Sequence, residues 1–134
     1  MDAYLSREVY QSLKALKLIS SSSTSEGFLL GHKRGHRFFV EKIFPSMPGF
    51  FPSLKKYQEL DQLFDGKLLG FFSFNQDEKN IKKILAPYAC GKLLLKIILN
   101  EQKKMTIQPY VIDYENEFFL LPIKLKSHQQ GNVK

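Results

Sequence analysis

The feature that most constrains this chain is the stretch Lys67–Asn75, which reads Lys-Leu-Leu-Gly-Phe-Phe-Ser-Phe-Asn. Its apolar run predicts a short buried strand that ends in a polar turn, and Asn80–Leu85 directly after it has helical spacing. The end of a strand is rigid and the turn beyond it is open, so catalytic side chains are often placed there. Here the strand tip carries Phe72, Ser73 and Phe74, with no imidazole, thiolate or carboxylate. We therefore expect that the end of this strand has the shape of a functional site but lacks the side chains needed for catalysis.

Composition limits the remaining possibilities. The chain has 134 residues, 43% hydrophobic and 25% charged, which suits one globular domain with its own core. Its net charge of +7 admits acidic partners such as nucleic acid, although lysines spread over solvated faces explain it more simply. Cys90 is the single cysteine, so no intrachain disulfide forms, a cytoplasmic location is favoured, and a buried, inert thiol is expected.

The start of the chain lacks the basic and apolar pattern of a secretory signal. No apolar run approaches the roughly 20 residues that span a bilayer, so we expect no membrane association through a spanning helix.

Periodicity predicts helices from a Ser6 cap to about Lys17, over Leu54–Phe64, and over Asn80–Leu85 with Asp77 as its cap. The strands are expected at 27–31, 37–44, 67–75, 93–99, 105–113 and 117–125. This order predicts one α/β (α+β) domain over residues 1–126, with a mixed, curved sheet of about six strands flanked by about three helices. Residues 127–134 form a polar tail that we expect to be disordered.

The first two strands are predicted to form a hairpin whose turn, 32–36, needs Gly35 for a positive φ. His32 and His36 lie four apart, which would suit a metal pair on a helix but has no such meaning across a turn. The candidate anion contacts of the chain are Lys33, Arg34, Arg37, Lys82 and Lys83. A solvated hairpin tip is the commoner explanation for the first three.

Pro45–Pro52 contains three prolines and a glycine, so regular structure is not expected there. The loop also carries Met47, Phe50 and Phe51. These side chains either tuck under the domain or form an exposed patch for a partner, and the sequence leaves both alternatives open.

Several of these segments, taken in order, resemble the MPN family, also called JAMM or JAB, whose active members are zinc isopeptidases that remove ubiquitin-like modifiers. Gly27–Gly31 is similar to the family's Gly-x-Leu-Leu-Gly strand, and Phe39–Pro45 to its second strand. Leu68–Asn75 is similar to the strand that ends in Gly-aromatic-aromatic-His-Ser-His-Pro, and Leu93–Leu99 to the buried strand after it. The resemblance covers roughly residues 5–125 and implies a single MPN-like domain.

The resemblance also implies where the metal site would lie. Active members bind zinc through the two histidines of His-x-His, and these positions are Phe72 and Phe74 here. Ser73 between them is retained, whereas Asn75 stands in the proline position. A phenyl ring offers no lone pair to zinc, so the resemblance implies a degenerate member with no bound metal or other cofactor.

The remaining positions of the site differ as well. The glutamate that would act as general base corresponds to Thr24, and Glu26 lies two residues further on, with the same strand parity. The aspartate ligand of a downstream Ser-x-x-Asp falls near Asp77 and Asn80. The candidate binding residues of this degenerate site are Glu26, Phe72, Ser73, Phe74, Asn75 and Asp77.

Three functions remain open. The favoured one is a catalytically inactive MPN-like pseudoenzyme that acts as a scaffold or protein-interaction module, with another protein or a second copy as its partner. The second is an enzyme with a remodelled site that uses Glu26, Ser73, Asp77 and a histidine of the hairpin. The third is a basic surface that binds nucleic acid through Arg34, Arg37, Lys55, Lys56, Lys82 and Lys83. It is less favoured because no basic and aromatic residues interleave along the sequence.

Overall fold

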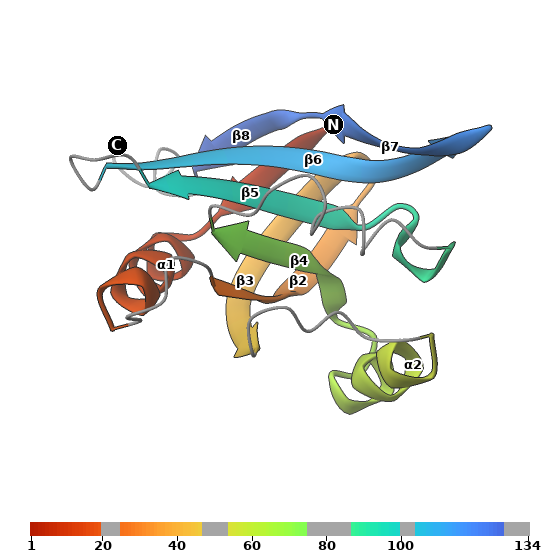
Figure 1. The fold of residues 1–134 in the computed structure, drawn as a ribbon, viewed down its shortest axis with the longest axis horizontal. Coiled ribbons are helices and arrows are strands. Elements are labelled where there is room, and N and C mark those ends of the chain that lie inside the picture. The colour runs from red at the N-terminus through yellow and green to blue at the C-terminus, as the bar shows by residue number, and fades with distance from the viewer. Residues whose placement is uncertain (20–24, 47–53, 75–86, 100–103, 128–134) are drawn as a thin grey trace.

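The computed structural model of this chain describes residues 1–19, 25–46, 54–74, 87–99 and 104–127. In chain order the elements are β1 (Asp2–Leu5), α1 (Arg7–Ile19), β2 (Ser25–Arg34), β3 (Arg37–Ser46), α2 (Leu54–Leu63), β4 (Leu68–Phe74), the 3₁₀ turn η2 (Pro87–Ala89), β5 (Leu93–Leu99), β6 (Met105–Glu115), β7 (Glu117–Pro122) and β8 (Lys124–Ser127). The eight strands of the described part form one sheet, in the order β7-β6-β5-β4-β2-β3-β1-β8 (Figure 1). The described part is therefore mostly sheet.

The two edge strands show that this sheet is strongly curved. β7 and β8 lie at opposite ends of the strand order, yet Pro122 ends one and Lys124 begins the other. Between them, the backbone N–H of Ile123 donates to the carbonyl of Pro109 in β6 at 3.1 Å. One residue cannot cross a flat sheet of eight strands, because neighbouring strands lie about 4.8 Å apart. The sheet therefore curls until its two edges nearly meet, in a barrel-like form.

α1 begins where the sequence predicts. The Oγ of Ser6 accepts a hydrogen bond from the backbone N–H of Val9 at 3.1 Å, which caps the first turn. Val9 and Leu13 are buried, and Leu16 packs beside them, so the helix turns one apolar face to the sheet. The expected helix is confirmed and continues to Ile19.

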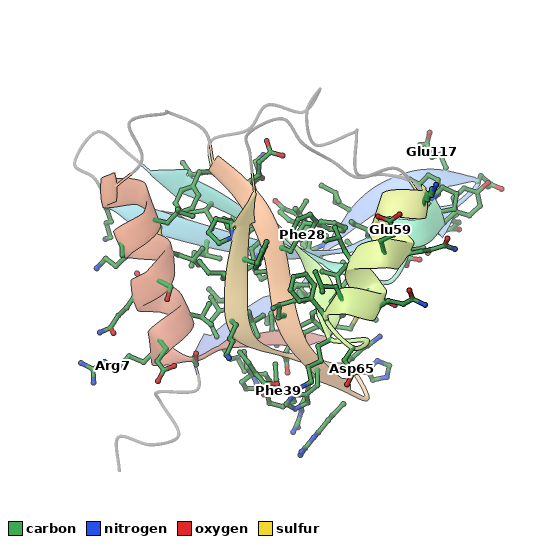
Figure 2. The ribbon with its side chains drawn as sticks, turned by 90° about the horizontal axis from the view of Figure 1, so that it is seen from below. Arg7, Phe28, Phe39, Glu59, Asp65 and Glu117 are labelled. Carbon is green, nitrogen blue, oxygen red and sulfur yellow. The ribbon has the colours of Figure 1, made fainter. Side chains whose placement is uncertain are left out.

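Side chains of the central strands alternate between two cores. The larger core holds residues of β1 to β6 together with α1, and it includes Phe72 and Phe74. The smaller core holds Phe28 and Phe71, with Leu60 of α2 packed against them. Figure 2 shows α1 and α2 on opposite sides of β2 and β3, with Phe28 on the side of α2. Both faces of the central strands are thus buried, as their apolar sequences require.

β4 and β5 pair in parallel and approach each other closely at Gly70, the partner of Leu93. A Cβ at Gly70 would lie 1.9 Å from the carbonyl oxygen of Leu93. Only glycine permits this approach, because every other residue would place a carbon inside the neighbouring backbone. The glycine of the central stretch therefore sets how closely these two strands pack.

The expectation of an α/β domain with about six strands and about three helices is wrong. The described residues contain eight strands and two α-helices. β1 and β8 are not among the expected strands. Each has four residues; the two pair in parallel with each other, and β1 also pairs in parallel with β3. The single strand expected over 117–125 is divided at Ile123 into β7 and β8. β7 pairs with β6, whereas β8 pairs with β1.

Other local expectations stand. The positive φ at Gly35 is confirmed, at +57°, and Gly66 after α2 has a φ of +72°. The helix expected over Asn80–Leu85 lies outside the described residues, as does the tail from 128 onward. Ser127, expected in the tail, ends β8, and Pro45, expected in an irregular segment, lies in β3. Among the described helices, none has the length and apolar character needed to cross a lipid bilayer.

Candidate functional site

Phe72 and Phe74, at the strand tip singled out by the sequence, are entirely buried. Both side chains have an exposed fraction of 0%, and their rings meet edge to face at 6.2 Å between centroids. Phe72 lies opposite Gly27 of β2, where an added Cβ would sit 2.7 Å from its ring. The two rings fill the larger core beside Leu95 and Ile97 of β5. They are therefore part of the core and offer no open pocket to a partner's side chain.

Glu26 and Ser73 lie on the opposite face of the same strands. They are direct partners in the pairing of β2 with β4, so their side chains project to one side, together with Phe28 and Phe71. Both are buried, with exposed fractions of 1% and 2%. The structure thus brings Glu26 and Ser73 together and separates them from Phe72 and Phe74, because residues that alternate along a strand point to opposite faces.

The pair places a carboxyl group and a hydroxyl in a sealed location. Within the described residues, the Oγ of Ser73 has no hydrogen-bond partner. Nucleophilic catalysis by a serine requires an adjacent base within hydrogen-bond reach and access for substrate. Neither a Ser73–Glu26 hydrogen bond nor such access is present in the described part. No group of three or more His, Cys, Asp or Glu side chains there is arranged to hold a metal ion.

Many of the predicted site residues fall outside the described residues. These are Thr24, Met47, Phe50, Phe51, Asn75, Asp77, Asn80, Lys82 and Lys83. The predictions made for them stay predictions.

The hairpin of β2 and β3 is tighter than expected. Its turn consists of Gly35 and His36, so His32 belongs to β2 and faces Phe39 of β3. The Nδ1 of His32 lies 2.7 Å from Oε1 of Glu41, and this hydrogen bond lowers the pKa of the Glu41 carboxyl. Both side chains are about half exposed, so the pair contributes little to stability.

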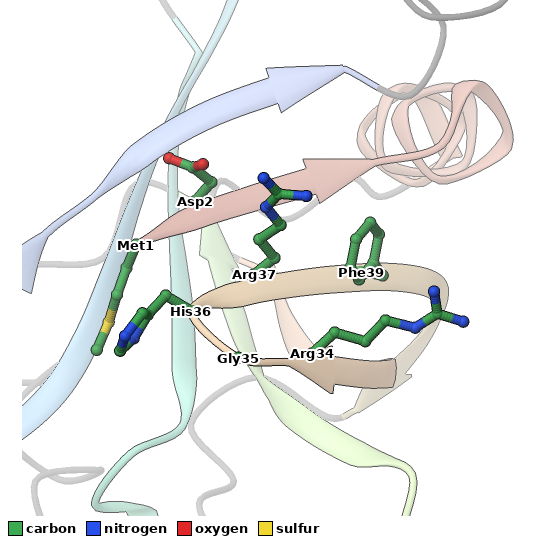
Figure 3. A pocket seen from close by; sticks show the side chains of 7 residues that line it. All are labelled: Met1, Asp2, Arg34, Gly35, His36, Arg37 and Phe39. Atoms are coloured by element: carbon green, nitrogen blue, oxygen red, sulfur yellow. The ribbon is translucent and has the colours of Figure 1, made fainter.

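The predicted basic residues of this hairpin are exposed at its tip. The Nζ of Lys33 lies 5.0 Å from the centroid of Phe38, and the guanidinium of Arg34 lies 6.0 Å from that of Phe39. Arg34 and Arg37 line a hollow of about 470 Å³ together with Met1, Asp2, Gly35, His36 and Phe39 (Figure 3). The figure shows Arg37 and Phe39 projecting from the same side of β3.

Aromatic residues extend this basic region across the sheet. Tyr4 of β1 stacks on Phe39 at 5.0 Å, with ring planes 14° apart, and His32 stacks on Phe39 at 4.9 Å, with planes 16° apart. The Nζ of Lys126 in β8 lies 6.0 Å from the Tyr4 ring. The sequence analysis misses this arrangement, because basic and aromatic residues interleave across four strands rather than along the chain. The alternation of Asp2–Leu5 and of Lys124–Ser127 was the available signal.

Cys90 follows η2 and is exposed, so the expectation of a buried thiol is wrong. The preceding Ala89 is buried. The short apolar context of Cys90 does not reveal which of the two neighbours faces the core.

Comparison with known proteins supports the fold alone. No protein-family model matches this sequence, and no curated protein matches it either. Among solved structures, the chain is similar to the solution structure of protein DSY2949 from Desulfitobacterium hafniense, with a TM-score of 0.64 and 18% identity. The alignment covers 94% of each chain. At this identity the likeness establishes a shared fold, and any function has to be argued from the residues of this chain.

Proposed function

We propose that this chain is a non-hydrolytic binding module, a degenerate relative of the MPN proteins that acts by holding a protein partner. The observation that carries the proposal is the complete burial of Phe72 and Phe74 in the larger core. In the MPN resemblance these two positions would supply the nitrogen ligands of zinc. Hydrocarbon at both positions leaves no donor pair there to hold a metal or to lower the pKa of a bound water.

The orientation of the strand supports the same conclusion. Glu26 and Ser73 are buried polar residues of this strand pair, and they face away from Phe72 and Phe74. A zinc-bound water must be reached by its ligands and by its general base from one cavity. Residues on opposite faces of one sheet do not meet this condition.

The hairpin of β6 and β7 is a candidate contact surface for a protein partner. Tyr114 is 56% exposed and packs on its strand partner Phe118 at 4.9 Å between ring centroids. Aromatic residues with part of their surface open to solvent are enriched in protein interfaces. A second copy of this chain is the simplest partner.

A remodelled enzyme is the competing proposal, favoured by the direct pairing of Glu26 with Ser73. It requires that a substrate reach two side chains that are now almost fully buried. If it holds, Ser73→Ala abolishes a hydrolytic activity that the protein shows toward some ester or amide substrate. If the binding module holds, Ser73→Ala changes no activity.

The test of the proposal is an isopeptidase assay with an isopeptide-linked ubiquitin-like substrate, run with added zinc and again with a chelator. We expect no turnover in either condition. Zinc-dependent turnover that the chelator removes would overturn the proposal. In parallel, light scattering with Tyr114→Ser as the variant tests the contact surface: a dimer that dissociates on substitution supports a second copy as partner.

A further inference from the structure

Four neighbouring strands place two rows of side chains on one exposed face of the sheet. The strand register aligns Lys126 of β8, Tyr4 of β1, Phe39 of β3 and His32 of β2, which we call the ring row. The same register aligns Lys124, Asp2, Arg37 and Arg34, which we call the basic row. Ala3, Leu5, Phe38 and Val40 alternate with these residues and are buried, so both rows lie on the face away from the larger core.

The charges of this face are predominantly positive. The carboxylates that the described parts of β1, β2, β3 and β8 place on this face are Asp2, whose Oδ2 lies 3.6 Å from the Nζ of Lys126, and Glu41, which is bonded to His32. Within the described residues, Arg34, Arg37 and Lys124 make no ion pair. Three exposed cations in one row are thus left to attract an anion.

The rings add a second kind of contact. Tyr4, Phe39 and His32 stack in sequence, with Lys126 at one end and the guanidinium of Arg34 against Phe39. Packing on one another holds the rings in place, so little side-chain entropy is lost when a ligand binds. Tyr4 and Phe39 are only half-buried and leave part of their edges open.

We propose that this face binds single-stranded nucleic acid, with phosphates on the basic row and bases against the ring row. The inference stands independently of the proposed function, because it uses none of the residues at the β2–β4 tip. A single strand presents a charged backbone on one side and flat apolar bases on the other. The two rows lie two residues apart along the strands, about 7 Å, which matches this division.

The hollow at the end of the basic row adds depth to the surface. At about 470 Å³, it lies within the size range of small-ligand sites, and Arg34, Arg37 and Phe39 line it. One nucleotide unit of the strand would place its phosphate between the two arginines. A duplex is a poorer fit, because its bases are stacked inside the helix and do not reach the rings.

The experiment is fluorescence anisotropy with a labelled 12-nucleotide oligo-thymidine at several salt concentrations. The variant Arg34→Ala/Arg37→Ala removes two phosphate contacts, and Lys14→Ala/Lys55→Ala removes two exposed charges from α1 and α2 as the matched control. We expect the first variant to bind at least about 10-fold more weakly and to lower the slope of log K against log salt by about 1.4. The control should bind nearly as the wild type does.

A gain in affinity provides a test that misfolding cannot imitate. Asp2→Asn removes the one carboxylate of the basic row, so we expect tighter binding and a steeper salt dependence. An oligomer of the same length without bases tests the ring row. Because Tyr4 and His32 cover the two faces of Phe39, the bases contact ring edges. We therefore expect the oligomer without bases to bind about 2- to 10-fold more weakly, and Tyr4→Leu to reduce this difference.

Three results would overturn the proposal. Equal losses in the arginine variant and the control would show that binding is spread over the whole basic protein. Equal affinity for the baseless oligomer, or for heparin at the same charge, would show a surface for polyanions in general. Binding to anionic lipid vesicles in place of the oligonucleotide would assign the face to a membrane.

Discussion

The substitution Phe72→Ala gives the sharpest test of how the central strand is built. The ring is fully buried, so its removal loses the free energy of transferring the ring out of water. At about 25 cal/mol per Å² and about 150 Å² of buried ring, this loss is roughly 4 kcal/mol. Loss of the edge-to-face contact with Phe74 adds about 0.5–1.5 kcal/mol.

Relaxation of the neighbours offsets part of this loss, but the site can collapse only a little. Phe72 belongs to β4, which is paired on both sides by β2 and β5, so the backbone around the cavity is fixed. We therefore expect Phe72→Ala to lower the free energy of unfolding by about 4 kcal/mol. For a domain of total stability about 5–15 kcal/mol, this is a large fraction.

Urea unfolding followed by circular dichroism measures the effect, with the midpoint shifted and the slope unchanged. Leu63→Ala is the control, because Leu63 is 73% exposed and should change stability by less than about 0.5 kcal/mol. Phe72→Leu keeps an apolar side chain and should cost distinctly less than the alanine variant. The reasoning is refuted if Phe72→Ala is no more destabilising than Leu63→Ala.

Three further outcomes follow from the structure. Gly70→Ala should destabilise the fold by about 3 kcal/mol or more in the same urea assay, because the added Cβ would meet the carbonyl oxygen of Leu93. A variant as stable as the wild type would disprove the close approach of β4 and β5. The pKa of Glu41 is lowered by its hydrogen bond to His32, so the pair contributes stability above the ordinary value of 4.5 and loses it as pH falls through the lower, folded pKa. Glu41→Gln should therefore have a slightly lower Tm than the wild type at pH 7 and the same Tm near about pH 2, and an equal difference at both pH values would contradict this. Exposed Cys90 should react with a thiol reagent in the native protein as fast as in urea, whereas protection would mean that it is covered.

Local patterns in the sequence were sufficient for the central elements. The apolar runs of Leu68–Phe74 and Leu93–Leu99 predict β4 and β5, because strands buried on both faces have no polar alternation to obscure them. The cap residue Ser6 and the spacing of Val9 and Leu13 predict α1, because a helix cap and helical periodicity are both local signals.

The two short strands β1 and β8 could not be predicted in this way. β1 and β8 have four residues each, and they exist because the curved sheet brings the two ends of the described chain together in parallel. Alternation within each segment is compatible with a strand, but it does not show that two segments more than 100 positions apart pair in parallel. The ring row depends on the same pairing, so its interleaved cations and aromatics became visible only with the register.

The Glu26–Ser73 pair marks the limit of parity arguments. Period-2 alternation predicts which residues of one strand share a face, but it does not fix how β2 aligns with β4. The observed register puts Glu26 opposite Ser73, on the other face from Phe72 and Phe74. A shift by one residue would have reversed this assignment.

The most direct test of the account is a calorimetric titration of the chelator-treated protein with zinc. The buried phenyl rings of Phe72 and Phe74 offer no donor to a metal, and the proposed function rests on this property. The proposed function predicts no one-to-one site with a Kd below about 1 μM. A tight, stoichiometric zinc site that is lost in Glu26→Gln would contradict it.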